Sequence, residues 1–371
     1  MTATGSGIDA RIERVDVTAY EVPTATEHES DGTLIWSSTT LVVVELHCGD
    51  HIGLGYTYCD PSAAKVVESK LVPILEQADP LMPQKAWAEM QMQTRQMGND
   101  GIAAMAISAV DIAMWDLKAR LLDVCLADAL PRFRESVPIY GSGGFTSYTP
   151  DELRDQVQGW VDNGFNSVKI KVGRDAKADP ERVALVRSIV GPDAEVMVDA
   201  NGANSPSDAV RWASLYSDEF GVSYFEEPVS SDDLHGLRYV HDHAPPGMAI
   251  AAGEYGWNLP YFQRMLEAQA VHILQADVTR CGGVTNMLRV DGLCKARCLP
   301  SSAHCAPAVS AHVCSAMETL VHIEYFFDHY RIEGMLFDGT LQPESGLLTP
   351  DRSRPGLGIE LKRSDARRYE V

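Results

Sequence analysis

Ionisable side chains recur at the ends of short apolar segments in the second half of the chain. In chain order they are Lys169 and Lys171, Asp199, Glu226 or Glu227, Glu254, Asp277, His304 and Glu324. From Lys171 to Glu324, taking Glu226, the spacings are 28, 27, 28, 23, 27 and 20 residues, which is one strand-plus-helix unit each time. Because the carboxyl ends of parallel barrel strands share one face, we expect these side chains to converge in a ring.

Three of these residues are carboxylates on consecutive segments: Asp199, Glu226 and Glu254. A single Asp or Glu after a strand is usually a helix N-cap or a solvated loop residue. Three that converge would repel one another unless a cation holds them, and a ligand set made only of oxygens suits Mg²⁺. We therefore predict a magnesium site, although periodicity alone does not choose between Glu226 and Glu227.

Lys169 and Lys171 alternate with Val168, Ile170 and Val172. Successive side chains of a strand point to opposite faces, so the two lysines share a face. Both could be solvated on an edge strand, but the apolar flanks favour an internal strand that directs the two ammonium groups at the carboxylates. We expect a lysine that is crowded by the other cation and by Mg²⁺ to have its neutral form favoured, as a general base requires.

Asp277 and His304 end the next two segments. A lone histidine is more often structural than catalytic, yet a neighbouring carboxylate would fix its tautomer and orient its ring. We therefore predict that His304 is an acid/base and that Asp277 orients it. His241 and His243 lack such a setting and are predicted to lie in a loop.

These residues need a scaffold, and the sequence contains eight β-prone segments from about Val137 onward, each followed by a helical stretch. The segments are VPIYGSGG, SVKIKVG, AEVMVDANG, VSYFEEP, MAIAAGE, HILQADV, CLPSSAH and LVHIEYF. One helix is predicted to begin with Thr149 as its N-cap and Glu152 as the capping-box glutamate. Eight strands that alternate with helices over roughly 200 residues predict an α/β fold, a (β/α)8 or TIM-like barrel.

The rest of the chain predicts a second domain. We expect an α+β capping domain at residues 1–134, the catalytic barrel at 135–341, and a C-terminal segment at 342–371 that returns to the capping domain. Within the capping domain, β-prone runs in 11–47 flank a polar loop at 24–33, and a nearly all-apolar helix follows at 101–122.

Composition narrows the classes of function. Lys and Arg total 31 against 52 Asp and Glu, a formal net charge of −21, which disfavours binding to nucleic acid and to anionic lipid. No run of about 18 apolar residues is present, so we expect no membrane span. The N-terminal residues lack an apolar signal segment, which predicts a cytoplasmic protein with mostly reduced, structural cysteines.

Several motifs occur in a fixed order. They are Lys-x-Lys, Asp-x-Asn, Glu-Glu-Pro, Gly-Glu, Asp-x-x-x-x-Gly-Gly-Val-Thr, Ser-Ser-x-His and a final Ile-Glu. Together they resemble the mandelate racemase subgroup of the enolase superfamily over nearly the whole chain. The resemblance implies Mg²⁺ on Asp199, Glu226 and Glu254, and a Lys or His base that forms an enediolate from the substrate.

The resemblance also implies a role for each remaining site residue. Lys171 is the base on one face of the substrate, and Lys169 helps to hold the substrate carboxylate. His304, paired with Asp277, is the acid/base on the other face. Glu324 is the carboxylic acid that donates a hydrogen bond to the enolate oxygen.

These roles predict that the enzyme removes the proton next to the carboxylate of a small molecule. Loss of water from a sugar acid, giving a 2-keto-3-deoxy acid, is favoured over racemisation or epimerisation of a 2-hydroxy acid, because the polar loop PTATEHESDGTLIW would hydrogen-bond a polyol. Glu27, His28 and Asn201 are predicted substrate contacts. Since Glu27, Glu29 and Asp31 occupy a loop without Lys or Arg, we expect an aldonate rather than a diacid. A non-catalytic sugar-acid-binding protein is a third interpretation, and the family implies a homo-oligomer.

Overall fold

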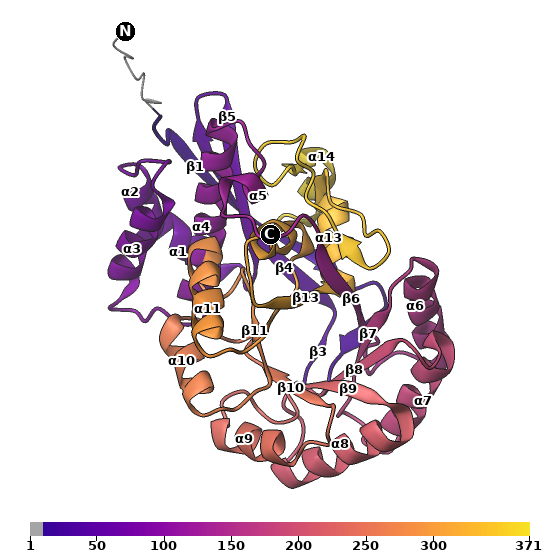
Figure 1. The fold of residues 1–371 in the computed structure, drawn as a ribbon. Helices are drawn as coiled ribbons and strands as arrows, with labels where there is room; N and C mark the ends of the chain where they lie inside the picture. The colour runs from indigo at the N-terminus through magenta and orange to yellow at the C-terminus, as the bar shows by residue number, and fades with distance from the viewer. Residues whose placement is uncertain (1–9) are drawn as a thin grey trace.

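The computed structural model describes residues 10–371, and residues 1–9 of the predicted capping domain lie outside the described residues. Eight parallel strands close into a barrel, because β13 pairs with both β12 and β6 (Figure 1). They are β6 (Val137–Gly143), β7 (Ser167–Lys171), β8 (Glu195–Asp199), β9 (Val222–Glu226), β10 (Ala249–Ala252), β11 (Ile273–Ala276), β12 (Ser301–Ala303) and β13 (Leu320–Phe326). The predicted (β/α)8 barrel is confirmed. A short strand, β15 (Leu347–Leu348), adds to β6 in antiparallel fashion.

Helices follow the strands and form the outer layer of the barrel. They are α6 (Pro150–Asp162), α7 (Asp179–Val190), α8 (Pro206–Phe220), α9 (Leu234–His243), α10 (Leu259–Glu267), α11 (Gly283–Ala296), α12 (Pro307–Cys314) and α13 (Phe327–Leu336). Helix α6 begins with the predicted capping box, in which Thr149 and Glu152 each accept a hydrogen bond from the other's backbone N–H. The loop predicted for His241 and His243 is wrong, because both lie in the last turn of α9, whose inner face buries Leu237.

The inward face of the strands changes from apolar to charged toward their carboxyl ends. Tyr140, Met197, Tyr224 and Ala251 form a buried cluster. Asp199 lies two residues after Met197 on β8, and Glu226 lies two residues after Tyr224 on β9. Because side chains of a strand alternate between its two faces, each carboxylate points to the same face as the apolar residue before it. The charged site therefore lies above a plug of packed side chains.

The capping domain combines an antiparallel sheet with helices. The sheet has the order β1 (Arg14–Pro23), β4 (Ser38–Cys48) and β5 (His51–Tyr58). The other elements are the hairpin β2 (Glu29–Ser30) and β3 (Ile35–Trp36), α1 (Ser62–Val66), the π-helix η1 (Val67–Leu71), α2 (Val72–Leu75), α3 (Pro83–Thr94), α4 (Ile102–Leu121) and α5 (Leu126–Ala129). Gly55 of β5 lets α4 approach closely, since a Cβ there would lie 2.1 Å from the carbonyl oxygen of Ala109.

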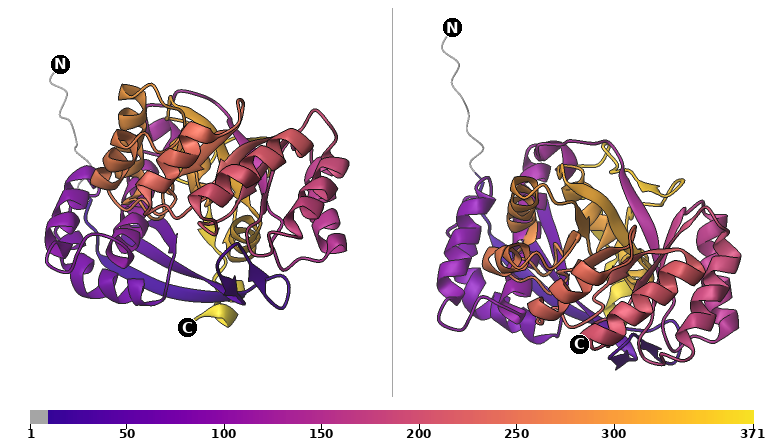
Figure 2. Two further views of the ribbon diagram at one scale, coloured as in Figure 1. Left: turned by 90° about the horizontal axis from the view of Figure 1, so that it is seen from below. Right: turned by 60° about the horizontal axis from the view of Figure 1, so that its bottom comes forward.

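The capping domain contacts the loops that follow the barrel strands (Figure 2). Ser30 of the hairpin contacts the Thr146 hydroxyl, after β6, at 2.6 Å. Thr57 of β5 donates to the carbonyl oxygen of Thr279, after β11, at 2.7 Å. The cap therefore lies at the carboxyl ends of the strands, where active sites of such barrels are built.

The C-terminal residues return to the capping sheet. After β14 (Phe337–Asp338) and β16 (Glu360–Leu361) have paired, α14 (Arg363–Ala366) brings Arg363 to within 2.7 Å of Glu45 on β4. The backbone N–H of Val371 donates to the carbonyl oxygen of Ala19 on β1 at 3.1 Å. Over residues 10–371, no helix is both long enough and apolar enough to cross a membrane.

Candidate active site

Asp199, Glu226 and Glu254 come together at the carboxyl ends of the strands. All three are buried, and one carboxylate oxygen from each lies within 4.8 Å of the others. Asp199 and Glu226 are directly in register on β8 and β9. Among residues 10–371, Glu226 Oε1 and Glu254 Oε2 are buried without a hydrogen-bond partner. Three convergent buried carboxylates, two of which have an oxygen without a hydrogen-bond partner, form a donor set that fits a hard divalent cation.

Glu227 is close to this group but differs from Glu226 in its backbone. Glu226 is the last residue of β9 and keeps the inward direction of its strand. Glu227 has a φ of 37°, which turns the chain out of the strand. Burial and the charge of Glu254 raise the pKa of Glu227 well above its ordinary value. The geometry therefore selects Glu226 for the three-carboxylate group.

The two lysines lie on one face, as predicted, and both contact carboxylates. Lys169 Nζ is 2.6 Å from Glu226 Oε2, and Lys171 Nζ is 2.5 Å from Asp199 Oδ2. Burial is the largest single influence and would lower the pKa of Lys171, but the carboxylates of Asp199, Glu324 and Glu254 together raise it above its ordinary value. The protein groups by themselves thus favour the charged form, because the nearest neighbour of Lys171 is a carboxylate and not the second ammonium. The expected neutral form depends also on Mg²⁺ and stays a prediction.

Asp277 orients His304. Asp277 Oδ2 lies 2.7 Å from His304 Nδ1, while His304 Nε2 lies 3.2 Å from Glu254 Oε2. Burial would raise the pKa of Asp277, but contacts with His304 and Arg280 lower it. An ionised Asp277 accepts a hydrogen bond from the Nδ1–H group, so Nε2 is the ring nitrogen that faces the carboxylate group.

Two donors hold one carboxylate oxygen of Glu324. Ser142 Oγ donates to Glu324 Oε1 at 2.5 Å, and Lys169 Nζ lies 2.9 Å from the same oxygen. Burial would raise the pKa of Glu324, but Lys169 and His304 lower it below its ordinary value. Glu324 is therefore set as an ionised acceptor in this arrangement, whereas its predicted role requires a proton.

The predicted substrate contacts are not all brought to the site. Asn201 follows the strand of Asp199, with a φ of 44°, and its backbone N–H donates to Asp199 Oδ1 at 2.9 Å. Glu27 and His28, in contrast, are exposed at the surface. The buried acidic residues of that loop are Glu29 and Asp31. The hairpin fold of the loop turns Glu29 inward and leaves Glu27 and His28 outside the carboxylate group.

The acidic loop is therefore less charged toward the barrel than its sequence suggests. Burial, together with the neighbouring Asp328 carboxyl group, raises the pKa of Glu29 to about 9. The carboxylate of Asp31 accepts hydrogen bonds from the backbone of its own loop. Arg174 donates to two carbonyl oxygens of the loop, at 2.9 and 2.6 Å. Near neutral pH, Glu29 offers the site a protonated carboxyl group.

Three further residues take part in the site without having been predicted. Gln275 donates to Glu226 Oε2 at 3.1 Å, and its position two residues before Asp277 on an inward strand face was a usable signal. Ser142 lies on the inward face of β6, and its place in the strand alternation was likewise a usable signal. Cys305, whose Sγ is 3.1 Å from His304 Nε2, had no such signal, because a φ of 50° turns it back toward the histidine.

The fold is a closed barrel with a cap, and its site places three convergent carboxylates between a lysine pair and an Asp–His pair. This arrangement defines a class of protein that can hold a cation next to two proton-carrying groups. Residues 14–130 match the family model "Mandelate racemase / muconate lactonizing enzyme, N-terminal domain", and residues 152–366 match "Enolase C-terminal domain-like". The chain belongs to the mandelate racemase and muconate lactonizing enzyme family of the enolase superfamily.

Characterised relatives share most of the chain. A 3,6-anhydro-alpha-L-galactonate cycloisomerase of Streptomyces coelicolor is 30% identical over 358 residues, which are 94% of this chain and 97% of the relative. An arabinonate dehydratase of Saccharolobus solfataricus is 28% identical over 336 residues, 87% of this chain and 88% of the relative. Both matches extend across the cap and the barrel.

Solved structures agree with this fold. A mandelate racemase/muconate lactonizing enzyme-like protein from Rubrobacter xylanophilus has 57% identity and a TM-score of 0.95, covering 97% of this chain and 100% of the other. A racemase from Streptomyces coelicolor with bound magnesium has 29% identity and a TM-score of 0.90, with the same coverage. The L-talarate/galactarate dehydratase of Salmonella typhimurium, liganded with Mg and L-lyxarohydroxamate, has 26% identity and a TM-score of 0.88, covering 100% of this chain and 95% of the other.

Proposed function

We propose that this protein is a Mg²⁺-dependent dehydratase of a sugar acid. The observation that carries the proposal is that two proton-carrying side chains, Lys171 and His304, contact two different carboxylates of the three-carboxylate group. Lys171 contacts Asp199 at 2.5 Å, and His304 approaches Glu254 at 3.2 Å. A ligand that binds at the carboxylates therefore has a lysine on one side and a histidine on the other, which simple binding does not require.

Asp199, Glu226 and Glu254 would hold the magnesium ion. The fit rests on the convergence of the three buried carboxylates and on the unpaired oxygens of Glu226 and Glu254, and two of the similar structures contain magnesium. When bound, Mg²⁺ supplies Lewis-acid stabilisation of the negative charge that develops on the substrate carboxylate. Cation binding at Asp199 would also take this carboxylate from Lys171 as an ion-pair partner. Loss of that partner would lower the pKa of Lys171 toward the range of a base.

The protein residues divide the proton transfers between them. Lys169 would donate to the substrate carboxylate, and Lys171 would take the proton from the adjacent carbon to give an enediolate. His304 would then give the Nε2 proton to the hydroxyl group on the next carbon, so that the C–O bond breaks and water leaves. The resulting enol tautomerises to the 2-keto-3-deoxy acid. Asp277 stabilises the imidazolium through Nδ1.

The role of Glu324 depends on Lys169. In the structure the ammonium group of Lys169 lies 2.9 Å from Glu324 Oε1 and keeps its pKa low. A substrate carboxylate that accepts from Lys169 would share this positive charge and raise the pKa of Glu324. A protonated Glu324 could then donate to the enolate oxygen as charge develops there.

We propose an aldonate as the substrate. The two arginines that follow the barrel strands are already engaged: Arg174 binds loop carbonyl oxygens, and Arg280 lies 3.3 Å from Glu254 Oε1. Glu29 of the capping loop and Asp328 of α13 are two buried acidic residues where this loop meets the barrel. A second carboxylate would be repelled by the Asp328 carboxylate, whereas hydroxyl groups can donate to Asp328 and accept from the protonated Glu29.

The alternative enzyme function is racemisation or epimerisation, which the same pair of bases on two sides would serve. The experiment that separates the two is a screen of acid sugars for 2-keto-3-deoxy products, with solvent deuterium exchange at the proton next to the carboxylate followed in parallel. A keto-deoxy product supports the dehydratase. Exchange with inversion and no such product supports the epimerase, and no exchange with any bound acid would indicate a binding protein.

A further inference from the structure

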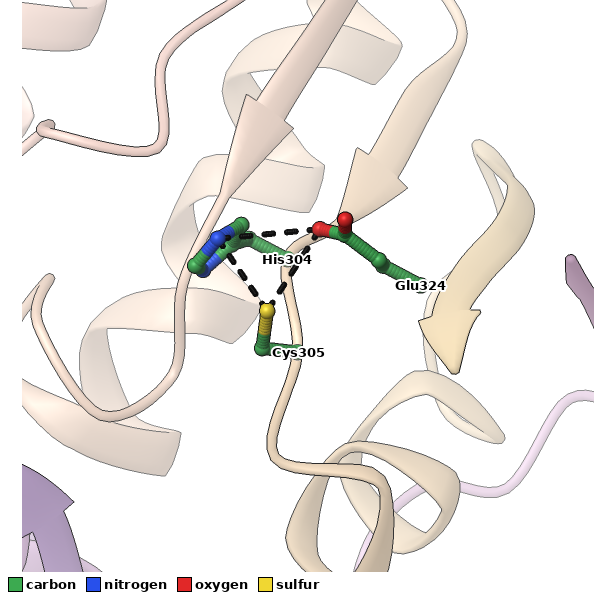
Figure 3. A group of neighbouring side chains, drawn as sticks. All are labelled: His304, Cys305 and Glu324. Atoms are coloured by element: carbon green, nitrogen blue, oxygen red, sulfur yellow. Dashed lines mark hydrogen bonds and ion pairs between the residues drawn. The ribbon is translucent and has the colours of Figure 1, made fainter. Parts of the chain in front are cut away.

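A second cluster of metal-ligating atoms lies beside the three-carboxylate group and contains a thiol. Figure 3 shows His304, Cys305 and Glu324 with their polar atoms directed at one another. Cys305 Sγ lies 3.1 Å from His304 Nε2 and 3.4 Å from Glu324 Oε2, and the nitrogen and the oxygen are 3.6 Å apart. All three residues are buried. The set combines nitrogen, sulfur and oxygen, unlike the oxygen-only magnesium group.

We propose that His304, Cys305 and Glu324 form a second cation site that takes a borderline-soft metal such as Zn²⁺. Tetrahedral zinc, with bonds of about 2.0 to 2.1 Å to nitrogen and oxygen and about 2.3 Å to sulfur, separates its ligand atoms by about 3.3 to 3.6 Å. The three measured separations fall in or just below this range. The cluster needs only small side-chain movements to close on the ion.

The residues around the cluster hold its ligands in place. Asp277 accepts from Nδ1 of His304 at 2.7 Å, which leaves Nε2 as the coordinating atom and is the usual outer partner of a zinc-bound histidine. Ser142 fixes the other oxygen of Glu324. Ser310 donates to the carbonyl oxygen of Cys305 at 2.7 Å, and so holds the turn that presents the thiol. The ligands are preorganised without the metal.

Selectivity between the two sites follows from ligand chemistry. Thiolate and imidazole favour zinc and cadmium, whereas carboxylate oxygens alone favour magnesium. Binding at Cys305 replaces the thiol proton by the metal, and this proton leaves to the solvent. Excess Mg²⁺ should therefore fill the carboxylate group without displacing the soft cation.

Occupation of this site would remove Nε2 of His304 from proton transfer. This consequence rests on the proposed function, since it assumes that His304 is the acid/base. Zinc would then inhibit the magnesium enzyme without displacing Mg²⁺, and the thiol beside the histidine would make the enzyme sensitive to soft metals.

The test is a titration of the Mg²⁺-saturated protein with Cd²⁺, followed by the ultraviolet charge-transfer absorption of a cadmium–thiolate bond. We expect a saturable band that Zn²⁺ displaces and that Cys305→Ser loses. Glu324→Gln should weaken the apparent affinity at least about 10-fold. Cys298→Ser, at the exposed cysteine, is the control and should keep the band.

A band that persists in Cys305→Ser, or one that disappears in Cys298→Ser, would overturn the site. The band is read independently of turnover, so it separates this inference from the proposed function. Cadmium that binds through Cys305 while turnover continues would support the metal site and count against the role given to His304.

Discussion

Lys171 Nζ lies 2.5 Å from Asp199 Oδ2, and the two residues are directly in register on β7 and β8. The residue proposed as the base is thus ion-paired to a residue proposed as a metal ligand. Cation binding and proton abstraction are therefore coupled through one carboxylate oxygen. Any change at Asp199 should alter both the affinity for the metal and the charge of Lys171.

Removing a metal ligand should abolish turnover. Asp199→Ala, Glu226→Ala and Glu254→Ala each break an octahedral oxygen site that tolerates little distortion, so we expect a loss of more than about 100-fold in turnover. In the unaltered protein, a 100-fold excess of Mg²⁺ over its Kd should add about 2.7 kcal/mol to the free energy of unfolding. Thermal unfolding with and without Mg²⁺ should show no such gain in the variants. Full activity in excess chelator would contradict the assignment.

The two proton carriers should separate exchange from elimination. His304→Asn should lose dehydration by about 100- to 10,000-fold, because the leaving hydroxyl no longer receives a proton. Lys171→Ala should retain some elimination if His304 can also take the first proton. Deuterium exchange measured by NMR decides the order of events. Exchange without elimination in His304→Asn assigns the first step to Lys171, and full dehydration by that variant would refute the role of His304.

The buried Glu29 should make stability depend on pH. Burial and Asp328 raise its pKa from 4.5 to about 9, so its contribution is complete below about pH 4.5 and is lost as the pH rises through about 9. We expect the free energy of unfolding to fall across this window, and to fall less steeply in Glu29→Gln. Denaturant titrations at several pH values measure the slope. The exposed neighbour provides the control, because Glu27→Gln should leave the slope unchanged; an equal slope in Glu29→Gln would be evidence against a buried neutral carboxyl group.

The junction between the cap and the barrel should depend on Asp111. This buried residue of α4 accepts hydrogen bonds from the backbone N–H and the hydroxyl group of Thr285 on α11, at 2.8 and 2.7 Å. Asp111→Ala leaves these buried donors unpaired, so we expect a loss of about 1 to 3 kcal/mol in the free energy of unfolding. Asp218→Ala, on the exposed face of α8, should change it by less than about 0.5 kcal/mol. Urea midpoints compare the two, and equal midpoints would contradict the prediction.

Aldonates should be better substrates than aldarates of matching configuration. The Asp328 carboxylate, where the capping loop meets the barrel, would repel a second carboxylate by about 1 to 4 kcal/mol at close range, which corresponds to about 5- to 1,000-fold in kcat/KM. Steady-state kinetics on paired monoacids and diacids measures the preference. A higher kcat/KM for the diacid would show that a cationic group reaches the far end of the substrate.

The sequence by itself determined the scaffold and most of the carboxylate ring. Apolar segments alternate with helices at the spacing of one βα unit, and each segment ends in a polar residue. Closure of the barrel must therefore bring those polar residues to one face. Lys169 and Lys171 share a face because their separation is two. Asp277 and His304 lie at the ends of neighbouring strands, which is why their pairing could be predicted.

The tertiary structure decided the features that the alternation of side chains along a strand does not specify. It selected Glu226 over Glu227 through the backbone turn after β9, and it paired Lys171 with Asp199, a partner that strand alternation does not specify. In the capping loop it buried Glu29 and exposed Glu27, because the hairpin packs on barrel residues more than a hundred positions away. These outcomes depend on cross-strand register, on left-handed turns and on long-range packing, and none of the three leaves a periodic mark in the sequence.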